Sequence, residues 1–171
     1  MQIFRPFKEH EESAKFLDDR RLNKQIVEAY QLAQLSLRKL GLLPYEKLGY
    51  LNHPMAIYIY NEGKPYLPDL TSYMKKLNEE WIARGFKRGA EFQAKLDNLF
   101  KIVTDNPKLF DWNAMPPYYV FEGDRIQGDE VYNKYQQLLE RKWSQDVIPF
   151  KRTIAVSDKI YIQSDKNLAL I

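Results

Sequence analysis

The stretch Phe16-Leu17-Asp18-Asp19-Arg20-Arg21-Leu22-Asn23-Lys24-Gln25-Ile26-Val27-Glu28 predicts a helix with one polar and one apolar face. Positions three and four apart share a helix face, so Arg20, Lys24 and Glu28 form a polar row, with Arg21 and Gln25 beside it. The apolar stripe has the helical period and consists of Leu22, Ile26, Ala29, Tyr30, Ala33 and Leu37. A charged row is usually a solvated face, but cations and amides also bind phosphates and base edges.

Periodic apolar residues extend this helix and predict others along the chain. The first helix is expected from about Glu11 to Leu40, with a restart at Asp18 or Asp19, because Gly41 is a typical helix stop. Later helices are expected over residues 54–60, 70–85, 87–104 and 129–143, although residues 54–60 also suit a strand. The apolar residues 2–7 are expected to pack on the helical body, and the proline-containing segment 105–117 to form a loop.

The end of the chain has a different pattern. Beyond Pro149, residues 153–156 and 160–162 alternate in the way of two strands around a turn. We therefore predict a mainly α fold, a compact single-domain helical bundle with a small C-terminal β-hairpin. Residues 1–147 would form the helical domain, and residues 148–171 the hairpin extension packed on the same domain.

Composition limits the possible functions. The 171 residues include 26 Lys and Arg and 23 Asp and Glu, so the net charge is only +3, and any nucleic-acid binding must depend on where the cations lie. The chain has no cysteine and two histidines, which excludes thiolate metal sites and disulfides, and we expect no metal or cofactor. It has no apolar run of about 20 residues and no secretory signal, so we expect a cytoplasmic protein without membrane contact.

Three motifs in order carry a resemblance to a known family. They are Leu17-Asp18-Asp19-Arg20-Arg21-Leu22-x-Lys24-Gln25-x-x-Glu28, then Asn52-His53-Pro54, and then Glu80-Trp81-x-x-Arg84-Gly85-Phe86. Together they resemble the pyrimidine-dimer DNA glycosylase family, the UV-repair endonucleases of the T-even phage type, and especially its bacterial and archaeal branch. The resemblance covers roughly residues 1–120.

The resemblance implies a DNA-repair glycosylase with lyase activity on double-stranded DNA. Enzymes of this family use the N-terminal α-amine as a nucleophile that forms a Schiff base with C1′ of a damaged nucleotide, and a free α-amine is partly neutral at physiological pH. A nearby carboxylate handles protons, and arginines hold the kinked DNA while a base is extruded. Because Gln2 is bulky, Met1 is expected to stay, and its amine is the candidate nucleophile.

The chain departs from the family at the position of the catalytic carboxylate, which is Arg21 here. Glu28 is the first candidate to replace it, and the alternative for Glu28 is a surface ion pair with Lys24. Asp18 and Asp19 are further candidates, although both suit a helix start better. His53 is a candidate acid-base or orienting group, and its alternative is a helix cap before Pro54.

Several polar residues are candidates for DNA binding. Arg20 and Lys24 match the backbone-binding cations of the family, and the other candidates are Arg5, Arg21, Gln25, Asn52 and Arg84. The aromatic residues Trp112, Tyr118 and Tyr119 would stack on bases or, more commonly, fill a core. A monomer is expected. The competing functions are a DNA-binding protein of the same fold without catalysis and an enzyme acting on nucleotides.

Overall fold

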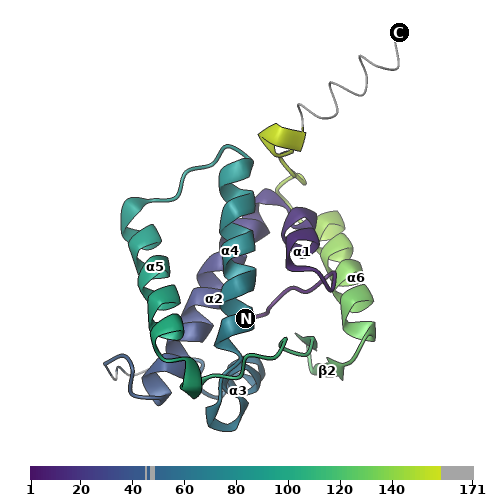
Figure 1. Cartoon of the computed structure of the whole chain (residues 1–171). Helices are drawn as coiled ribbons and strands as arrows, with labels where there is room; N and C mark the ends of the chain where they lie inside the picture. The colour runs from purple at the N-terminus through teal and green to yellow at the C-terminus, as the bar shows by residue number, and fades with distance from the viewer. Residues whose placement is uncertain (45, 47–48, 159–171) are drawn as a thin grey trace.

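The computed structural model of the chain describes residues 1–44, 46 and 49–158. Figure 1 shows α2 and α4 packed together at the centre, with α5 on one side and α6 on the other. The fold class is mainly α, as the sequence predicts. In chain order the elements are α1 (His10–Phe16), α2 (Asp19–Lys39), α3 (Pro54–Tyr60), the 3-10 turn η1 (Asn61–Gly63), α4 (Leu67–Ala83), α5 (Ala90–Asp105), the 3-10 turn η2 (Pro107–Leu109), β1 (Tyr118–Phe121), β2 (Asp124–Gln127) and α6 (Glu130–Gln145).

Helix α2 lies in the core because one of its faces is apolar along its whole length. The predicted stripe is buried except for Tyr30, which is half-buried, and it packs against α3 and α4. Asp18 caps the helix by accepting a hydrogen bond of 3.3 Å from the Arg21 amide. Just beyond its end, Gly41 has a φ of +76°, a conformation that suits glycine after a helix. The predicted break between α1 and α2 is therefore confirmed.

The other predicted helices are present with shifted ends. Helix α4 begins at Leu67 rather than Leu70, because Pro68 lies in the first turn, where no backbone N–H is needed. Helix α5 begins at Ala90 rather than Lys87. The segment 54–60 is helix α3 and not a strand, with Pro54 at its first position.

The β-hairpin lies earlier in the chain than the sequence pattern predicts. Strands β1 and β2 pair antiparallel, with Phe121 opposite Asp124, across the turn Glu122-Gly123. Both turn residues have positive φ, 46° and 90°, which matches the twist of paired strands. In the predicted strand region, residues 153–155 are not in a strand and residues 156–158 are helical, while residues 159–162 lie outside the described residues.

The chain beyond α6 returns to the start of α2. The Asp19 amide donates a hydrogen bond of 2.9 Å to the Lys151 carbonyl, and the Thr153 amide donates one of 2.9 Å to the Asp19 carboxylate. Residues 148–158 thus run against the helical body. The predicted domain division at residue 147 stays a prediction.

Candidate functional site at the N-terminus

The first residues of the chain are held in the core by a buried amide side chain. The Gln25 amide nitrogen donates to the Gln2 carbonyl at 3.0 Å, and its oxygen accepts from the Phe4 amide at 2.7 Å. Gln25 is fully buried, and Ile3 and Phe4 pack beside it. A side-chain amide can replace a strand partner in this way because it carries both a donor and an acceptor. The result is a fixed position for the N-terminal amine.

His53 lies beside this amine. The Met1 nitrogen is 3.4 Å from His53 Nε2, and the other ring nitrogen, Nδ1, accepts a hydrogen bond of 3.1 Å from the Met55 amide. His53 is therefore both the cap of α3 and a neighbour of the amine. Burial, the positive amine and Arg125 lower the pKa of His53, and Glu28 acts in the opposite direction. The imidazole is thereby favoured in its neutral form.

Glu28 comes to the same place from α2. One of its carboxylate oxygens accepts from the Gln2 amide at 3.5 Å, and the other lies 3.6 Å from the Lys24 ammonium. Its side chain is only 16% exposed, whereas that of Lys24 is 70% exposed. Glu28 therefore makes the ion pair with Lys24 and also contacts the backbone nitrogen next to the amine.

Met1 and His53 line a pocket of about 440 Å³, and Glu28 contacts Gln2, another lining residue, without lining the pocket itself. Sequence reasoning missed its far wall, which is the hairpin β1–β2, including the turn Glu122-Gly123 and the exposed Arg125. The signal was present, since Tyr118-Tyr119-Val120-Phe121 is a strand pattern followed by a short turn with glycine. The lining residues are Met1, Gln2, His53, Pro54, Val120, Phe121, Glu122, Gly123 and Arg125.

A group of cations lies along α2 and α6 beside this pocket. Arg20, Lys24 and Asn52 are exposed, as DNA-binding groups must be. Burial and the charges of Arg21 and Lys24 lower the pKa of Lys142, so this ammonium lies close to the cations of α2. Its Nζ is 5.0 Å from the centre of the Phe121 ring in the pocket wall. Lys142 is a second residue that sequence reasoning missed.

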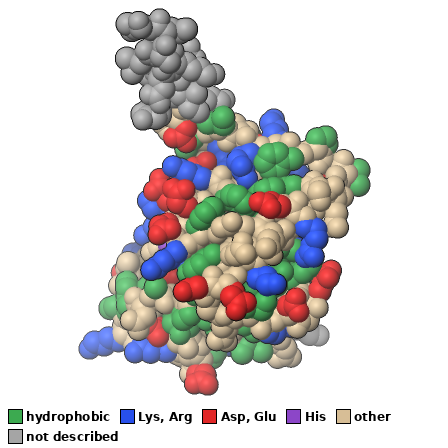
Figure 2. Space-filling view, turned by 90° about the vertical axis from the view of Figure 1, so that its right-hand side faces the viewer, with side chains coloured by type: hydrophobic (Ala, Val, Ile, Leu, Met, Phe, Trp, Pro, Cys, Tyr) green, Lys and Arg blue, Asp and Glu red, His purple; other side chains and the backbone are tan. Residues whose placement is uncertain are grey.

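The surface charge is otherwise mixed. Figure 2, which views the molecule from the right-hand side of Figure 1, shows basic and acidic side chains interspersed with hydrophobic ones. Contact with a polyanion would therefore depend on a few local cations rather than on the field of a whole face.

Three predicted DNA-binding residues have structural partners instead of an exposed position. Arg5 is buried and donates to the Met115 carbonyl at 3.3 Å and the Lys8 carbonyl at 3.2 Å. Gln25 is used to hold the N-terminus. Arg84 has a fully buried side chain and is 2.9 Å from both Asp19 and Glu80. These three side chains are buried and cannot contact a phosphate on the outside of the protein in this conformation. Their burial therefore argues against the predicted role in DNA binding.

Arg21 faces α6 and not the amine. Its guanidinium donates two hydrogen bonds to Asp146, at 2.7 and 2.9 Å, and lies 3.4 Å from Asp18. Hydrogen bonding to Asp146 is the main factor that raises the pKa of Arg21, so the cation is firmly held. This ion pair ties the end of α6 to the start of α2.

The remaining candidates lie away from the amine. Asp18 caps α2 and accepts from the Trp143 indole at 2.7 Å, while Asp19 pairs with Arg84, so both acids have the predicted helix-start role. Tyr119 is buried in the core, and Tyr118 stacks on Tyr58 with ring centres 4.3 Å apart.

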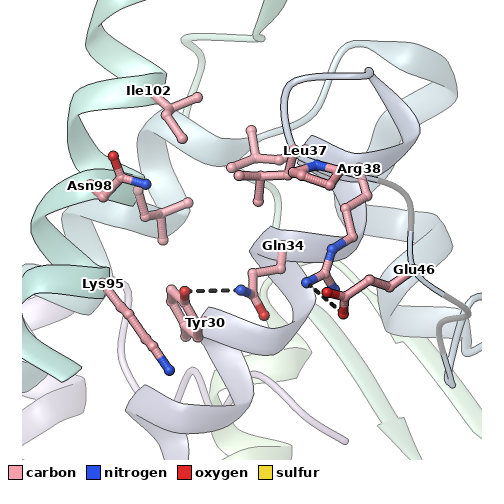
Figure 3. A pocket seen from close by; sticks show the side chains of 11 residues that line it. Tyr30, Gln34, Leu37, Arg38, Glu46, Lys95, Asn98 and Ile102 are labelled. Carbon is pink, nitrogen blue, oxygen red and sulfur yellow. Dashed lines mark hydrogen bonds and ion pairs between the residues drawn. The ribbon is translucent and has the colours of Figure 1, made fainter. Parts of the chain in front are cut away.

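A second pocket, of about 90 Å³, lies between α2 and α5 (Figure 3). Gln34 donates to the Tyr30 hydroxyl at 2.9 Å, and Arg38 donates to Glu46 at 3.3 Å. The polar groups that Figure 3 labels at this pocket are thus largely paired with one another. The amine, His53 and Glu28 are not among its lining residues, so the pocket at the N-terminus is the better candidate.

Comparison with known families bears on this geometry. Residues 1–94 match the model of the pyrimidine dimer DNA glycosylase family, which is more than half of the chain. The chain belongs to this family. The match includes Met1, Glu28 and His53 of this glycosylase-family protein, whereas the hairpin and α6 lie beyond it. It does not separate the branches of the family, so the expected likeness to the bacterial and archaeal branch stays a prediction. No curated protein and no solved structure matches the chain.

Membership in the family makes this a protein of the DNA-repair glycosylase kind, with DNA as the implied substrate. Among the described residues, no cluster of three or more His, Cys, Asp or Glu side chains could hold a metal ion. None of the described helices has the length and apolar character needed to cross a membrane.

Proposed function

We propose that this protein is a DNA glycosylase with associated lyase activity that attacks a damaged nucleotide with the Met1 amine. The observation that carries the proposal is that the amine and His53 line one open pocket while Glu28 contacts the adjoining Gln2 amide. The amine lies 3.4 Å from His53, and Glu28 contacts the next backbone nitrogen at 3.5 Å. By family resemblance the lesion is a pyrimidine dimer.

The chemistry needs few protein groups. The amine lone pair attacks C1′, and the glycosidic C1′–N bond breaks with its electron pair leaving on the base. Transfer of a proton from the amine nitrogen to O4′ and opening of the C1′–O4′ bond then produce an iminium ion and a free 4′-hydroxyl group. Removal of a C2′ proton allows the 3′ phosphate to leave by elimination, which cuts the strand. Glu28 is our candidate for accepting protons, because its carboxylate contacts the Gln2 backbone nitrogen, one residue from the amine.

Three exposed cations and the half-buried Lys142 provide the DNA contacts in this proposal. Arg20 and Lys24 lie on the outer face of α2, Lys142 lies near them on α6, and Arg125 lies on the opposite rim. Phosphate contacts of this kind set the position of DNA without reading its sequence. We assign DNA binding to these four residues and Asn52.

Borohydride trapping tests the proposal. The untagged protein is incubated with duplex oligonucleotides that carry an abasic site or a cyclobutane pyrimidine dimer, in the presence of borohydride. We expect a covalent protein–DNA band that is lost when the N-terminus is acetylated. Dependence of the band on the dimer would identify the lesion.

The control is a protein acetylated under the same conditions and shown to be folded by circular dichroism. Absence of a band with both DNAs from folded, unblocked protein would refute the amine mechanism. It would leave a DNA-binding protein of this fold or an enzyme acting on nucleotides.

A further inference from the structure

We infer that His53 acts on the Met1 amine as a hydrogen-bond donor through its Nε2–H, and not as a base. The inference rests on the proposed function, since it describes how the proposed nucleophile is kept reactive. Its geometric basis is that the two ring nitrogens of His53 face two different partners. Nδ1 faces the Met55 amide at 3.1 Å, and Nε2 faces the Met1 nitrogen at 3.4 Å.

The cap of α3 selects the tautomer of the ring. A backbone N–H can only donate, so Nδ1 must be the acceptor and cannot carry a proton while the cap is formed. A neutral imidazole carries one proton, which must then be on Nε2. A base acting through Nε2 would need the proton on Nδ1, where it would point at the Met55 N–H.

The doubly protonated ring is disfavoured because Nδ1 would then carry a proton that points at the Met55 N–H. The burial and nearby charges of the ring act in the same direction. Burial, the amine and Arg125 lower the pKa of His53, with Glu28 opposing them. The groups that act on the ring thus come from the N-terminus, β2 and α2, and Arg125 disfavours the doubly protonated ring whether or not the amine carries a proton. The ring therefore presents a donor to the amine near neutral pH.

This donor has a consequence for the amine. An ammonium group has only N–H donors, so it would meet the Nε2–H donor to donor, whereas a neutral amine accepts from it through its lone pair. The neutral amine is also the nucleophile in Schiff-base chemistry. Because Gln25 and Val120 hold residue 2 through hydrogen bonds of 3.0 Å each, the amine cannot easily turn away from the ring. On substrate binding the lone pair would pass from Nε2–H to C1′.

Two substitutions separate the roles of the two ring nitrogens. In His53→Asn the short side chain can still cap α3, because asparagine is a good capping residue, but it has no group at the Nε2 position. In His53→Gln the longer amide can place an N–H donor near the Nε2 position, while the cap is lost. His10→Asn is the matched control at the other histidine, which pairs with Asp69 at 2.9 Å.

The experiment measures acylation of the N-terminal amine at pH 7 in the absence of DNA, with the labelled N-terminal peptide quantified by mass spectrometry. We expect His53→Asn to label about fivefold more slowly than the wild type, because the unreactive ammonium form no longer meets the Nε2–H donor, and His53→Gln to label at close to the wild-type rate. Circular dichroism verifies that each variant is folded. Equal rates in the wild type and folded His53→Asn, or faster labelling of His53→Asn, would overturn the inference.

A second measurement observes the tautomer directly. Long-range ¹H–¹⁵N correlation spectra distinguish protonated from unprotonated ring nitrogens, and His10→Asn assigns the two rings. We expect His53 to carry its proton on Nε2 at pH 7. A proton on Nδ1 would overturn the inference. Because both readouts need no DNA, they can succeed when borohydride trapping fails, and the two proposals are tested separately.

Discussion

Gln25 shows how one residue can prepare a site without taking part in its chemistry. The sequence places it in a polar row and suggests a DNA contact, but its amide is fully buried and bonded to the backbone of Gln2 and Phe4. Sequence pattern cannot separate these roles, because the same amide that reads a base edge also pairs with a backbone. The partner of Gln25 is the N-terminal segment, which lies more than twenty residues away in the chain.

Arg21 is a second polar residue of α2 whose partner lies far away in the chain. Its bidentate contact with Asp146 holds α6 against α2, at 2.7 and 2.9 Å. Glu28, two turns along the helix, is the acid that contacts the N-terminal segment.

At Glu28 we predict a large loss of activity with little loss of stability. Glu28→Gln keeps an oxygen that can accept from the Gln2 amide but removes the proton acceptor, so we expect cleavage of abasic DNA to fall by about 10² or more. The lost ion pair with Lys24 should cost only about 0.3–0.5 kcal/mol. Single-turnover cleavage and urea unfolding measure the two effects.

The control for this substitution is Glu91→Gln, which removes the corresponding i,i+4 ion pair with Lys95 on α5. It should change neither activity nor stability noticeably. Full activity of Glu28→Gln would remove this carboxylate from the mechanism.

Among the elements, the start of α2 is a junction where several segments meet through Asp19 and Arg84. Arg84, at the end of α4, donates to Asp19 at 2.9 Å and to the Ala14 and Lys15 carbonyls at 3.3 and 3.2 Å. Thr153 donates to the same carboxylate through its amide at 2.9 Å and its hydroxyl at 2.6 Å. The motif Glu80-Trp81-x-x-Arg84-Gly85-Phe86 therefore includes a buried ion pair that joins helices.

This junction should make stability fall in acid. Burial acts to raise the pKa of Asp19, but hydrogen bonds from Thr153 and Arg84 outweigh it, and the pKa is lowered. A carboxylate with a lowered folded-state pKa stabilises the fold above its unfolded pKa of about 3.9 and loses that contribution as the pH falls through the folded value. We expect the unfolding free energy to decline below about pH 4.

Asp19→Asn isolates this effect. It should lower the unfolding free energy at pH 7 by on the order of 2 kcal/mol and flatten the acid dependence, because a neutral amide cannot lose the charge that Arg84 requires. Urea unfolding between pH 3 and pH 7 measures both effects. Asp97→Asn, at an exposed acid of α5, is the control and should leave both unchanged. If the free energy of unfolding of Asp19→Asn fell in acid as steeply as that of the wild type, the acid dependence would come from other carboxylates.

For the molecule as a whole, the net charge is only +3, so DNA binding depends more on where the cations lie than on how many there are. The mixed surface in Figure 2 agrees with this, since no part of that face is uniformly basic. The cations at the pocket come from α2, α6 and β2, three elements far apart in the sequence. Folding brings them to the surroundings of one pocket.

Salt dependence of DNA binding tests this arrangement. Lys24→Ala should reduce the slope of log K against log salt by about 0.9, the value for one phosphate contact on duplex DNA. Lys101→Ala is a closely matched control, because Lys101 is 75% exposed, compared with 70% for Lys24, and likewise pairs with an acid four residues along its helix. Fluorescence anisotropy at several salt concentrations gives the slopes. Equal slopes for the two variants would remove Lys24 from the DNA surface.

The sequence by itself determined the helices and the family, and it singled out Met1, Glu28 and His53, which the fold brings close together. Local patterns suffice for these, because helical periodicity, caps such as His53 before Pro54, and short motifs are written in neighbouring residues. The β-hairpin at residues 118–127 could have been predicted from its strand pattern and glycine-containing turn. The alternation of residues 153–156 and 160–162 predicts a hairpin in the wrong part of the chain.

Only the tertiary structure decided which polar residues are free. Arg5, Gln25 and Arg84 are buried, Arg21 is paired with Asp146, and Lys142 and Arg125 come to the pocket from beyond the family match. The physical reason is that a charged or amide group binds equally well to DNA, to a carboxylate or to a backbone carbonyl. Which of these partners it meets depends on contacts between segments that lie far apart in the chain.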